Sequence, residues 1–308
     1  MYTIRTAGLK GLGVFATTHI PRGTRIVAEA PLVTVKGERE VYGAITRLPQ
    51  RDIAFIRALS VNAGNNAISI LDRARAAWNL ISTSTLPTPS IVRDYSALLS
   101  AFRNNNFDLG AGVQALFTEI SRFNHSCIPS CQGNFNSALG KFTVHATRGI
   151  EAGEEMTVSY LGESGVALRE ERRGRLWRGF GFWCGCGICD EVSDDGGSEG
   201  RRTGMRDRLR EFAMGSADSN GRGHVEVDVL GELIGLFESE GLGGRELGMI
   251  YLSVAEKHAH LGNHEDARRS AARGLRIEET CVGSDSPLYH DSVQRMRRMS
   301  MQLTDEAP

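Results

Sequence analysis

The chain has 308 residues, 41% of them hydrophobic and 24% charged, which is the composition of an ordinary globular protein long enough for a substantial core. Its 36 basic and 37 acidic residues leave a net charge of −1. This balance argues against a dedicated nucleic-acid binder, because such proteins normally carry a basic surplus.

Signals for membranes and export are also missing from the sequence. No run of apolar residues approaches the roughly 18 that a membrane span needs. The N-terminal sequence MYTIRTAGLKGLG lacks the apolar stretch of a signal peptide. We therefore expect an intracellular protein, cytoplasmic or nuclear, without a membrane partner. In such a compartment its six cysteines are expected to be thiols or metal ligands rather than disulfides.

The first two thirds of the chain alternate between strand and helix patterns. β-Branched and apolar runs around a Pro-Gly turn predict two or three strands within residues 1–35. Apolar residues at helical spacing predict an insert of several short helices at residues 36–103. Strand patterns return at residues 104–163, where SALG predicts a hairpin turn. Residues 164–190 combine an amphipathic helix with a cysteine-rich segment.

The last third is predicted to be helical. A linker rich in Gly, Ser and Asp, with one short helix inside it, is expected at residues 191–223. Residues 224–308 predict consecutive helices that break at glycine-containing turns. Ala255, Ala267 and Ala271 fit the close contacts of a tetratricopeptide helix pair. A plain helical bundle explains the pattern equally well, because a repeat array normally contains about three copies.

The cysteines are unevenly placed. Three lie together in the sequence WCGCGIC, at Cys184, Cys186 and Cys189. Their C-x-C-x-x-C spacing is too crowded for mutual disulfides but suits thiolates that converge on one metal ion. A tetrahedral zinc site needs four ligands, and Cys127 or Cys131 is the obvious fourth. Cys281 stands alone.

The same segment also admits a redox interpretation. Cys186 and Cys189 form a true C-x-x-C pattern, and Trp183-Cys184-Gly185 resembles the start of a thioredoxin-type site. Such sites open a helix after a strand, whereas a glycine-rich run precedes these cysteines and an acidic, glycine-rich run follows them. The ligand count favours zinc.

The sequence RFNHSCIPSC at residues 122–131 contains an unusual polar run, made of Asn124, His125, Ser126 and Cys127. Four consecutive small polar or metal-capable side chains suit neither a strand nor a helix. They predict a tight turn whose polar groups face a ligand.

Two weaker signals frame this turn. Lys10-Gly11-Leu12-Gly13 is a glycine turn that lets backbone N–H groups approach a ligand, but a strand follows it rather than the helix of a phosphate-binding motif. Tyr160 ends the strand GEEMTVSY, a place where a tyrosine usually has a buried ring and a hydroxyl at the surface. Neither signal alone indicates a function.

Taken in order, the glycine turn, the NHSC turn, GEEMTVSY and C-x-C-x-x-C resemble the SET domain of protein-lysine methyltransferases. The resemblance covers residues 1–35 and about 100–190. It implies an α+β fold, with a SET-domain β-fold of small sheets, a pseudoknot, a helical insert and a zinc-bound post-SET segment. An all-α, tetratricopeptide-like C-terminal domain would follow. The chain is most similar to the SET-and-MYND subfamily and to fungal SET-domain proteins, but without the MYND finger, because no cysteine precedes Cys127.

The activity that the resemblance implies is S-adenosylmethionine-dependent N-methylation of a protein lysine, on a histone or another protein. Methyl transfer to an amine is an in-line displacement that depends mainly on positioning and electrostatics. Tyr160 would lie at the methyl-transfer centre, and Phe180, Phe182 and Trp183 would wall a channel whose apolar interior lowers the pKa of the substrate lysine. The expected partners are the substrate protein and a protein that binds the C-terminal helical domain.

The resemblance also assigns cofactor contacts. The backbone of the first turn would cradle S-adenosyl-L-methionine, and Asn124 and His125 would bind its amino acid and adenine ends. Phe182 would flank the adenine or the lysine channel. The implied cofactor-binding residues are Lys10, Gly11, Leu12, Gly13, Asn105, Ser121, Asn124, His125 and Phe182.

The second implied cofactor is Zn²⁺. Its implied ligands are Cys127, Cys184, Cys186 and Cys189, and Cys131 remains an alternative to Cys127. Zinc would tie the post-SET segment against the active site, so that metal binding and closure of the lysine channel would be one event. Ser130 departs from the family pattern, in which an asparagine is usual.

Two other functions stay open. A non-catalytic interaction protein would use the SET fold as a scaffold and the helical C-terminus as its binding surface, although the presence of Asn124, His125 and Tyr160 favours catalysis. A zinc-stabilised nucleic-acid binder would rest on the basic run at residues 169–178 alone. Such a run is more often the solvated face of a helix.

Overall fold

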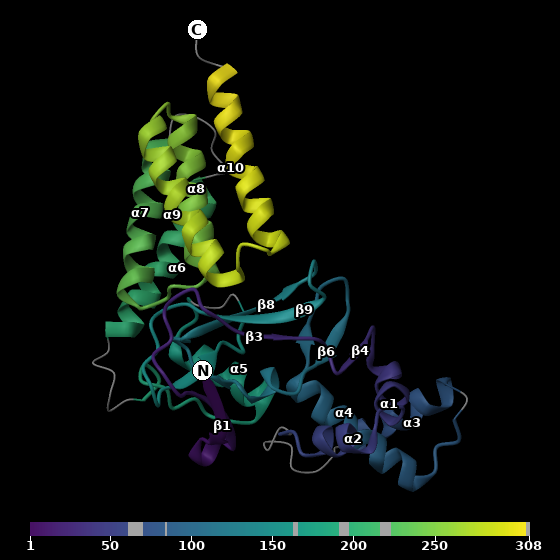
Figure 1. Ribbon diagram of the computed structural model, residues 1–308. Helices are drawn as coiled ribbons and strands as arrows, with labels where there is room; N and C mark the ends of the chain where they lie inside the picture. Colours follow the sequence, from purple (N-terminus) through teal and green to yellow (C-terminus); the bar gives the residue numbers. More distant parts are fainter. Residues whose placement is uncertain (61–69, 84, 163–165, 191–196, 216–222, 306–308) are drawn as a thin grey trace. The chain divides into compact units, whose positions relative to one another are not determined.

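The computed structural model describes residues 1–60, 70–83, 85–162, 166–190, 197–215 and 223–305 (Figure 1). The chain divides into two compact units. The first is built from Met1–Ala28, Phe123–Arg172 and Cys184–Pro308, and the second from Glu29–Arg122 and Arg173–Trp183. No helix within the described ranges has both the length and the apolarity to cross a membrane.

The first unit contains a four-stranded sheet that brings distant segments together. Its strand order is β1 (Tyr2–Thr6), β2 (Leu12–Ala16), β10 (Glu155–Val158) and β7 (Asn124–His125). β1 and β2 are antiparallel, as are β2 and β10, whereas β10 and β7 are parallel. In that parallel pair Thr157 lies opposite Asn124 and Val158 lies opposite His125. The start of the NHSC sequence therefore lies beside the strand that ends just before Tyr160.

A second sheet of the first unit has the strand order β3 (Arg25–Glu29), β9 (Lys141–Ala146) and β8 (Cys131–Asn136). β8 and β9 form the expected hairpin, and Gly140 in the SALG turn has a φ of 62°, which glycine adopts without strain. Both strands pack against α9 (His264–Val282) of the helical region (Figure 1). Gln132 Oε1 accepts a hydrogen bond from Arg245 N at 2.8 Å, and Asn134 Nδ2 donates to Cys281 O at 3.1 Å.

The described part of the first unit continues with α6 to α10, of which α7, α8 and α9 run side by side in Figure 1. Their bounds are α6 (Gly197–Gly215), α7 (Gly223–Ser239), α8 (Arg245–His260), α9 (His264–Val282) and α10 (Pro287–Asp305). The three alanines expected at close helix contacts, Ala255, Ala267 and Ala271, are buried. α8 and α9 therefore pack through small residues, as the sequence indicates.

The predicted linker at residues 191–223 is mostly helix. α6 occupies Gly197–Gly215 of this range, and residues 191–196 and 216–222 lie outside the described part of the chain. The described part of the stretch that suggested a linker, residues 197–200, forms the first turn of α6. Ser198 Oγ donates to Glu240 Oε1 at 2.5 Å, and Glu199 Oε1 accepts from Arg169 N at 2.8 Å. These long-range partners stabilise a helix that the local composition disfavours.

The crossing of α8 and α9 depends on Gly274. A Cβ atom added there would lie 2.7 Å from Leu252 Cδ2 and 2.9 Å from Gly248 O, which is a backbone atom that cannot move aside. We expect Gly274→Ala to lower the free energy of unfolding by about 1–3 kcal/mol in urea denaturation, the usual cost of overpacking. Gly235→Ala on α7 is the matched control, because nothing lies within 4 Å of its added Cβ. That control should be neutral or stabilising, and equal effects would contradict the packing argument.

The second unit contains the helical insert and a small sheet. Its helices are α1 (Glu38–Thr46), α2 (Gln50–Arg57), α3 (Ile70–Ser82) and α4 (Pro89–Asn105), and its strand order is β4 (Val33–Val35), β6 (Gln114–Leu116), β5 (Phe107–Asp108). α4 begins where the sequence predicts a break, with Pro89 in its first turn and Thr88 Oγ1 accepting from Ile91 N at 3.4 Å. Part of the apolar run before α3 falls on residues 61–69, which are outside the described ranges.

Candidate functional site

The NHSC sequence begins as the short strand β7, and strand geometry sends its first two side chains to opposite faces. Asn124 is partly exposed, whereas His125 is buried with 5% of its surface accessible. After β7 the backbone follows β10 for one more bond, because Ser126 N donates to Val158 O at 3.1 Å. The two side chains consequently belong to two different clusters.

Asn124 lies in a polar cluster with the first turn of the chain. Its Nδ2 donates to Glu155 Oε1 at 2.7 Å and to Leu12 O at 3.1 Å. Glu155 Oε2 accepts from Lys10 Nζ at 2.8 Å. Because both amide hydrogens of Asn124 have protein acceptors, its Oδ1 is the atom that remains to accept a hydrogen bond from a ligand.

Gly13 provides the space for this polar cluster. A Cβ atom added at Gly13 would lie 2.8 Å from Glu155 Oε1 and 2.9 Å from Asn124 Nδ2. The first turn itself is the 3-10 helix η1 (Gly8–Lys10). Within it, Lys10 N donates to Ala7 O and Gly11 N donates to Gly8 O. These two N–H groups already have acceptors, so the expected backbone contacts to a cofactor stay predictions.

Glu155 is a site residue that the sequence analysis missed. It lies two residues before Thr157, the residue opposite Asn124, and the two-residue period of a strand places both on one face of β10. The GEEMTVSY motif contains this glutamate, but only the pairing of β7 with β10 shows that it faces Asn124. The sequence does not show which distant strands pair, so it could not place Glu155 beside Asn124.

His125 connects to Tyr160 and to Cys127. Its Nδ1 accepts from Tyr160 N at 3.0 Å, and its Nε2 lies 3.3 Å from Cys127 Sγ. Burial lowers the pKa of His125 to about 4, so the ring is neutral at pH 7. Both ring nitrogens are engaged with protein atoms, which leaves neither free to take a proton from a substrate.

Tyr160 is held at both ends. Its N–H donates to His125, and its hydroxyl donates to Phe123 O at 2.7 Å. Burial raises the pKa of Tyr160 well above its usual range, so the phenol stays protonated. The hydroxyl oxygen therefore presents lone pairs rather than a negative charge to a substrate.

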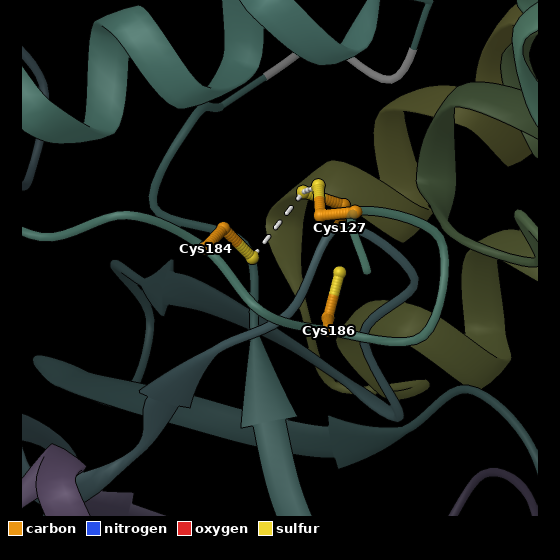
Figure 2. A group of neighbouring side chains, drawn as sticks. Cys127, Cys184 and Cys186 are labelled. Atoms are coloured by element: carbon orange, nitrogen blue, oxygen red, sulfur yellow. Dashed lines mark hydrogen bonds between the residues drawn. The ribbon is translucent and has the colours of Figure 1, made fainter. Parts of the chain in front are cut away.

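Four cysteines gather between the NHSC turn and the C-x-C-x-x-C segment. Three of them are labelled in Figure 2, and the sulfur atoms of Cys127, Cys184, Cys186 and Cys189 all lie within 4.8 Å of one another. Cys127 Sγ is 3.9 Å from Cys184 Sγ and 3.6 Å from Cys189 Sγ. A tetrahedral ion with Zn–S bonds of about 2.3 Å separates its sulfur atoms by about 3.8 Å. The four thiols thus fit one tetrahedral metal ion.

The other two cysteines lie outside this cluster. Cys131 is in β8, with its Sγ 3.7 Å from Ser130 Oγ, and Cys281 is in α9, with its Sγ 3.9 Å from Gly243 O. Burial raises the pKa of both thiols to about 12, so they stay protonated at pH 7. Of the two fourth ligands that the sequence allowed, the structure brings Cys127 to the cluster.

Two buried arginines border the cysteine cluster. Arg172 Nη2 lies 3.6 Å from Cys189 Sγ, and Arg202 Nη2 donates to Cys127 O at 3.2 Å. Arg202 Nε also donates to the buried Glu240 at 2.7 Å. Four thiolates with a divalent ion carry a charge of −2, which two guanidinium groups oppose. The basic run at residues 169–178 is therefore not simply a solvated helix face, because Arg172 near its start is 1% exposed.

Three of the expected cofactor contacts belong to the second unit. Asn105 ends α4, and its Nδ2 donates to Ser60 O at 2.7 Å and to Ala101 O at 2.8 Å. Ser121 is in η3 (Ile120–Arg122), and its buried Oγ has no hydrogen-bond partner among the residues described. The Phe182 ring lies 6.5 Å from the Phe180 ring. Their roles toward a cofactor stay predictions.

The aromatic residues expected to wall a lysine channel are also in the second unit. Trp183 stacks on Trp177 with 5.6 Å between ring centroids, and both side chains are exposed. α5 (Arg169–Phe180) supplies Trp177 and Phe180. By contrast, the glycine turn, Asn124, His125, Tyr160 and the four cysteines all belong to the first unit.

Comparisons with known proteins identify the family to which this region belongs. Residues 11–161 match the family model described as the SET domain. The chain is 30% identical over 182 residues to histone-lysine N-methyltransferase set5 of Schizosaccharomyces pombe, covering 58% of this chain and 47% of that protein. It is 24% identical over 225 residues to histone-lysine N-methyltransferase SET5 of Meyerozyma guilliermondii, covering 67% of this chain and 45% of the relative.

A shorter match is to human histone-lysine N-methyltransferase SMYD3, with 38% identity over 88 residues, 29% of this chain and 19% of that protein. The chain spans about half the length of the two fungal relatives. The matched range 11–161 includes Asn124, His125 and Tyr160, and Glu155 lies within it as well. The chain is therefore a SET-domain protein, homologous to the fungal SET5 proteins and to SMYD3.

Proposed function

We propose that the chain is an S-adenosylmethionine-dependent protein-lysine N-methyltransferase that acts on a histone. The observation that carries this proposal is the pairing of β7 with β10, which brings the segments of Asn124, His125 and Tyr160 together in one unit, within the range that matches the SET domain. The relatives named histone-lysine N-methyltransferases support a histone as the substrate. With such a substrate the protein would act in the nucleus.

The polar cluster around Asn124 fits the methionine end of the cofactor. Asn124 Oδ1 is free to accept from an ammonium group, and the absence of a side chain at Gly13 lets Asn124 and Glu155 lie against the first turn. The nearby Glu155 carboxylate is paired with Lys10 Nζ at 2.8 Å, so the contact to the ligand's ammonium group depends on Asn124 Oδ1. When bound, S-adenosylmethionine supplies an activated methyl group on a positively charged sulfur. Asn124, Gly13 and the backbone of His125 would hold it.

Tyr160 is the residue that we place at the reacting atoms. Its protonated hydroxyl is anchored by Phe123 O, and its oxygen can accept from the amine of the substrate lysine and so orient that amine. His125 does not serve as the base, because its nitrogens are occupied by Tyr160 N and Cys127 Sγ. The residues thus position the amine, and desolvation lowers its pKa enough for deprotonation.

The cysteine cluster would hold one structural zinc ion. All four ligands would be thiolates of the chain, and a closed set of four thiolates leaves no coordination position for a substrate. The ion would join the NHSC turn to the C-x-C-x-x-C segment within the first unit. Its contribution is therefore to folding and to the position of neighbouring residues.

Asn124 gives a direct test of the cofactor site. We expect Asn124→Ala to weaken S-adenosylmethionine binding by about 10- to 150-fold in calorimetry, because it removes a hydrogen bond to a charged ligand. Asn263→Ala is the matched control, since Asn263 precedes α9 and makes no side-chain capping bond there. An unchanged affinity in Asn124→Ala, with the protein folded, would reject the assignment.

The activity itself can be tested without choosing a substrate. Purified protein is incubated with radiolabelled S-adenosylmethionine and a cell extract, and labelled residues are identified by mass spectrometry. We expect label on lysine side chains, and loss of that label in Asn124→Ala. A folded protein that binds the cofactor and labels no lysine would support the alternative of an interaction scaffold.

A further inference from the structure

His125 has two hydrogen-bonding nitrogens, and each points to a different part of the site. Nδ1 accepts from Tyr160 N at 3.0 Å, so it carries no proton. In a neutral imidazole the proton is then on Nε2, which lies 3.3 Å from Cys127 Sγ. The ring therefore donates to the cysteine sulfur and accepts from the tyrosine backbone.

The His125 imidazole bonds to the strand-end backbone at the point where the backbone pairing of β7 with β10 stops. The pairing of β7 with β10 ends at His125 and Val158, and Ser126 N donates to Val158 O one step further. Tyr160 lies beyond that last backbone bond, and its N–H is bonded to the His125 side chain. The hydroxyl of Tyr160 is fixed by Phe123 O, the residue two positions before His125. Tyr160 is thus held at both ends by the segment that leads into Cys127.

We propose that His125 is a positioning residue through which the metal-bound Cys127 fixes Tyr160. The inference rests on the proposed zinc site and on the proposed role of Tyr160. A metal-bound thiolate accepts a stronger hydrogen bond than a neutral thiol, because the bond is then assisted by charge. Metal binding therefore holds the ring in the orientation that points Nδ1 at Tyr160 N. In this way, zinc bound by the four cysteines fixes the position of Tyr160 at the proposed methyl-transfer centre.

The burial of His125 and Cys127 suits such a connection between the metal site and Tyr160. His125 and Cys127 are 5% and 6% exposed, so water does not readily replace either hydrogen bond. Arg202 Nη2 holds the carbonyl of Cys127 from α6, which fixes the backbone on the cysteine side. The ring therefore sits between a fixed sulfur atom and the backbone of Tyr160.

Two isosteric variants of His125 separate its hydrogen bond to Tyr160 N from its hydrogen bond to Cys127 Sγ. Asparagine places its amide near the position of Nδ1, so His125→Asn keeps an acceptor for Tyr160 N and loses the donor to Cys127. Glutamine places its amide near Nε2, so His125→Gln keeps the donor and loses that acceptor. We expect zinc release to a chelator to be about 10- to 100-fold faster in His125→Asn and unchanged in His125→Gln.

The second readout is hydrogen exchange at the amide of Tyr160. In the zinc-loaded proteins we expect exchange about tenfold faster in His125→Gln than in wild type, with less change in His125→Asn. In wild type, removal of zinc should speed the exchange at Tyr160. The amide of Ala146, at the end of β9, donates to Thr24 O at 3.0 Å just before β3 and is the folding control.

Each outcome of these two measurements either supports the proposal or overturns it. Equal exchange at Tyr160 with and without zinc, while Ala146 stays protected, overturns it. If zinc removal also speeds hydrogen exchange at the amide of Ala146, the metal-free protein has partly unfolded, and the proposal is then tested on the zinc-loaded variants. Zinc release from His125→Asn at the wild-type rate would overturn the proposal. Neither readout uses methyl transfer. An active enzyme that lacks this coupling therefore disproves only the link, whereas a coupled protein that labels no lysine disproves only the proposed function.

Discussion

Tyr160→Phe is expected to lower the turnover of methyl transfer by about 100- to 1,000-fold, the loss typical of one preorganised polar group. The substitution removes a single oxygen and keeps the ring, so the affinity for S-adenosylmethionine should change little. In the structure the hydroxyl donates a hydrogen bond to Phe123 O at 2.7 Å, which fixes the position of that oxygen. A loss in turnover with binding retained is the signature of a contact that acts in the transition state.

The matched control for this substitution is Tyr251→Phe. The Tyr251 hydroxyl also donates a hydrogen bond, to Glu238 Oε1 at 2.8 Å, but in the helical region. Each variant should lose about 1 kcal/mol of stability from the missing bond, and only Tyr160→Phe should lose turnover. Steady-state kinetics, with calorimetry of the cofactor, measure both effects. A Tyr160→Phe protein with wild-type turnover would remove this tyrosine from the mechanism.

Cys184→Ser is expected to abolish stoichiometric zinc binding and to destabilise the first unit. A serine hydroxyl does not ionise at pH 7, so the cluster would lose one of four thiolate ligands. Structural zinc contributes roughly 10–16 kcal/mol of apparent binding free energy in small zinc-binding peptides, and this energy is coupled to folding. Elemental analysis of the purified protein should give one zinc per wild-type chain and less in the variant.

Cys131→Ser and Cys281→Ser are the controls for the metal site. Both cysteines are as buried as the cluster members, at 1% and 0% exposure, but their sulfur atoms lie elsewhere. Both variants should keep one zinc per chain. Full zinc in Cys184→Ser, or no zinc in the wild-type protein, contradicts the four-cysteine assignment.

Features fixed by short-range spacing could be predicted from the sequence. The C-x-C-x-x-C spacing and the need for a fourth ligand indicated a metal site, and the structure brings Cys127 to Cys184, Cys186 and Cys189. Helical periodicity located the insert, whose helices span Glu38–Asn105 with gaps. Motif order indicated the SET domain that the family match confirms.

Features that depend on long-range pairing could not be predicted. Glu155 meets Asn124 only because β10 pairs with β7, and Arg202 reaches Cys127 O from a helix that the sequence indicated as linker. Arg172 looked like part of a solvated surface but is buried beside Cys189. The choice between Cys127 and Cys131 was open in the sequence for the same reason. In each case the partner is distant in the chain, and local composition does not identify it.

The most direct measurement of the central claim is methyl transfer to purified core histones. Zinc-loaded protein is incubated with radiolabelled S-adenosylmethionine and histone octamers, with Tyr160→Phe in parallel. The account predicts label on histone lysine side chains by mass spectrometry, and a loss of about 100-fold or more in the variant. A folded wild-type protein that binds zinc and the cofactor yet labels no histone lysine would contradict it.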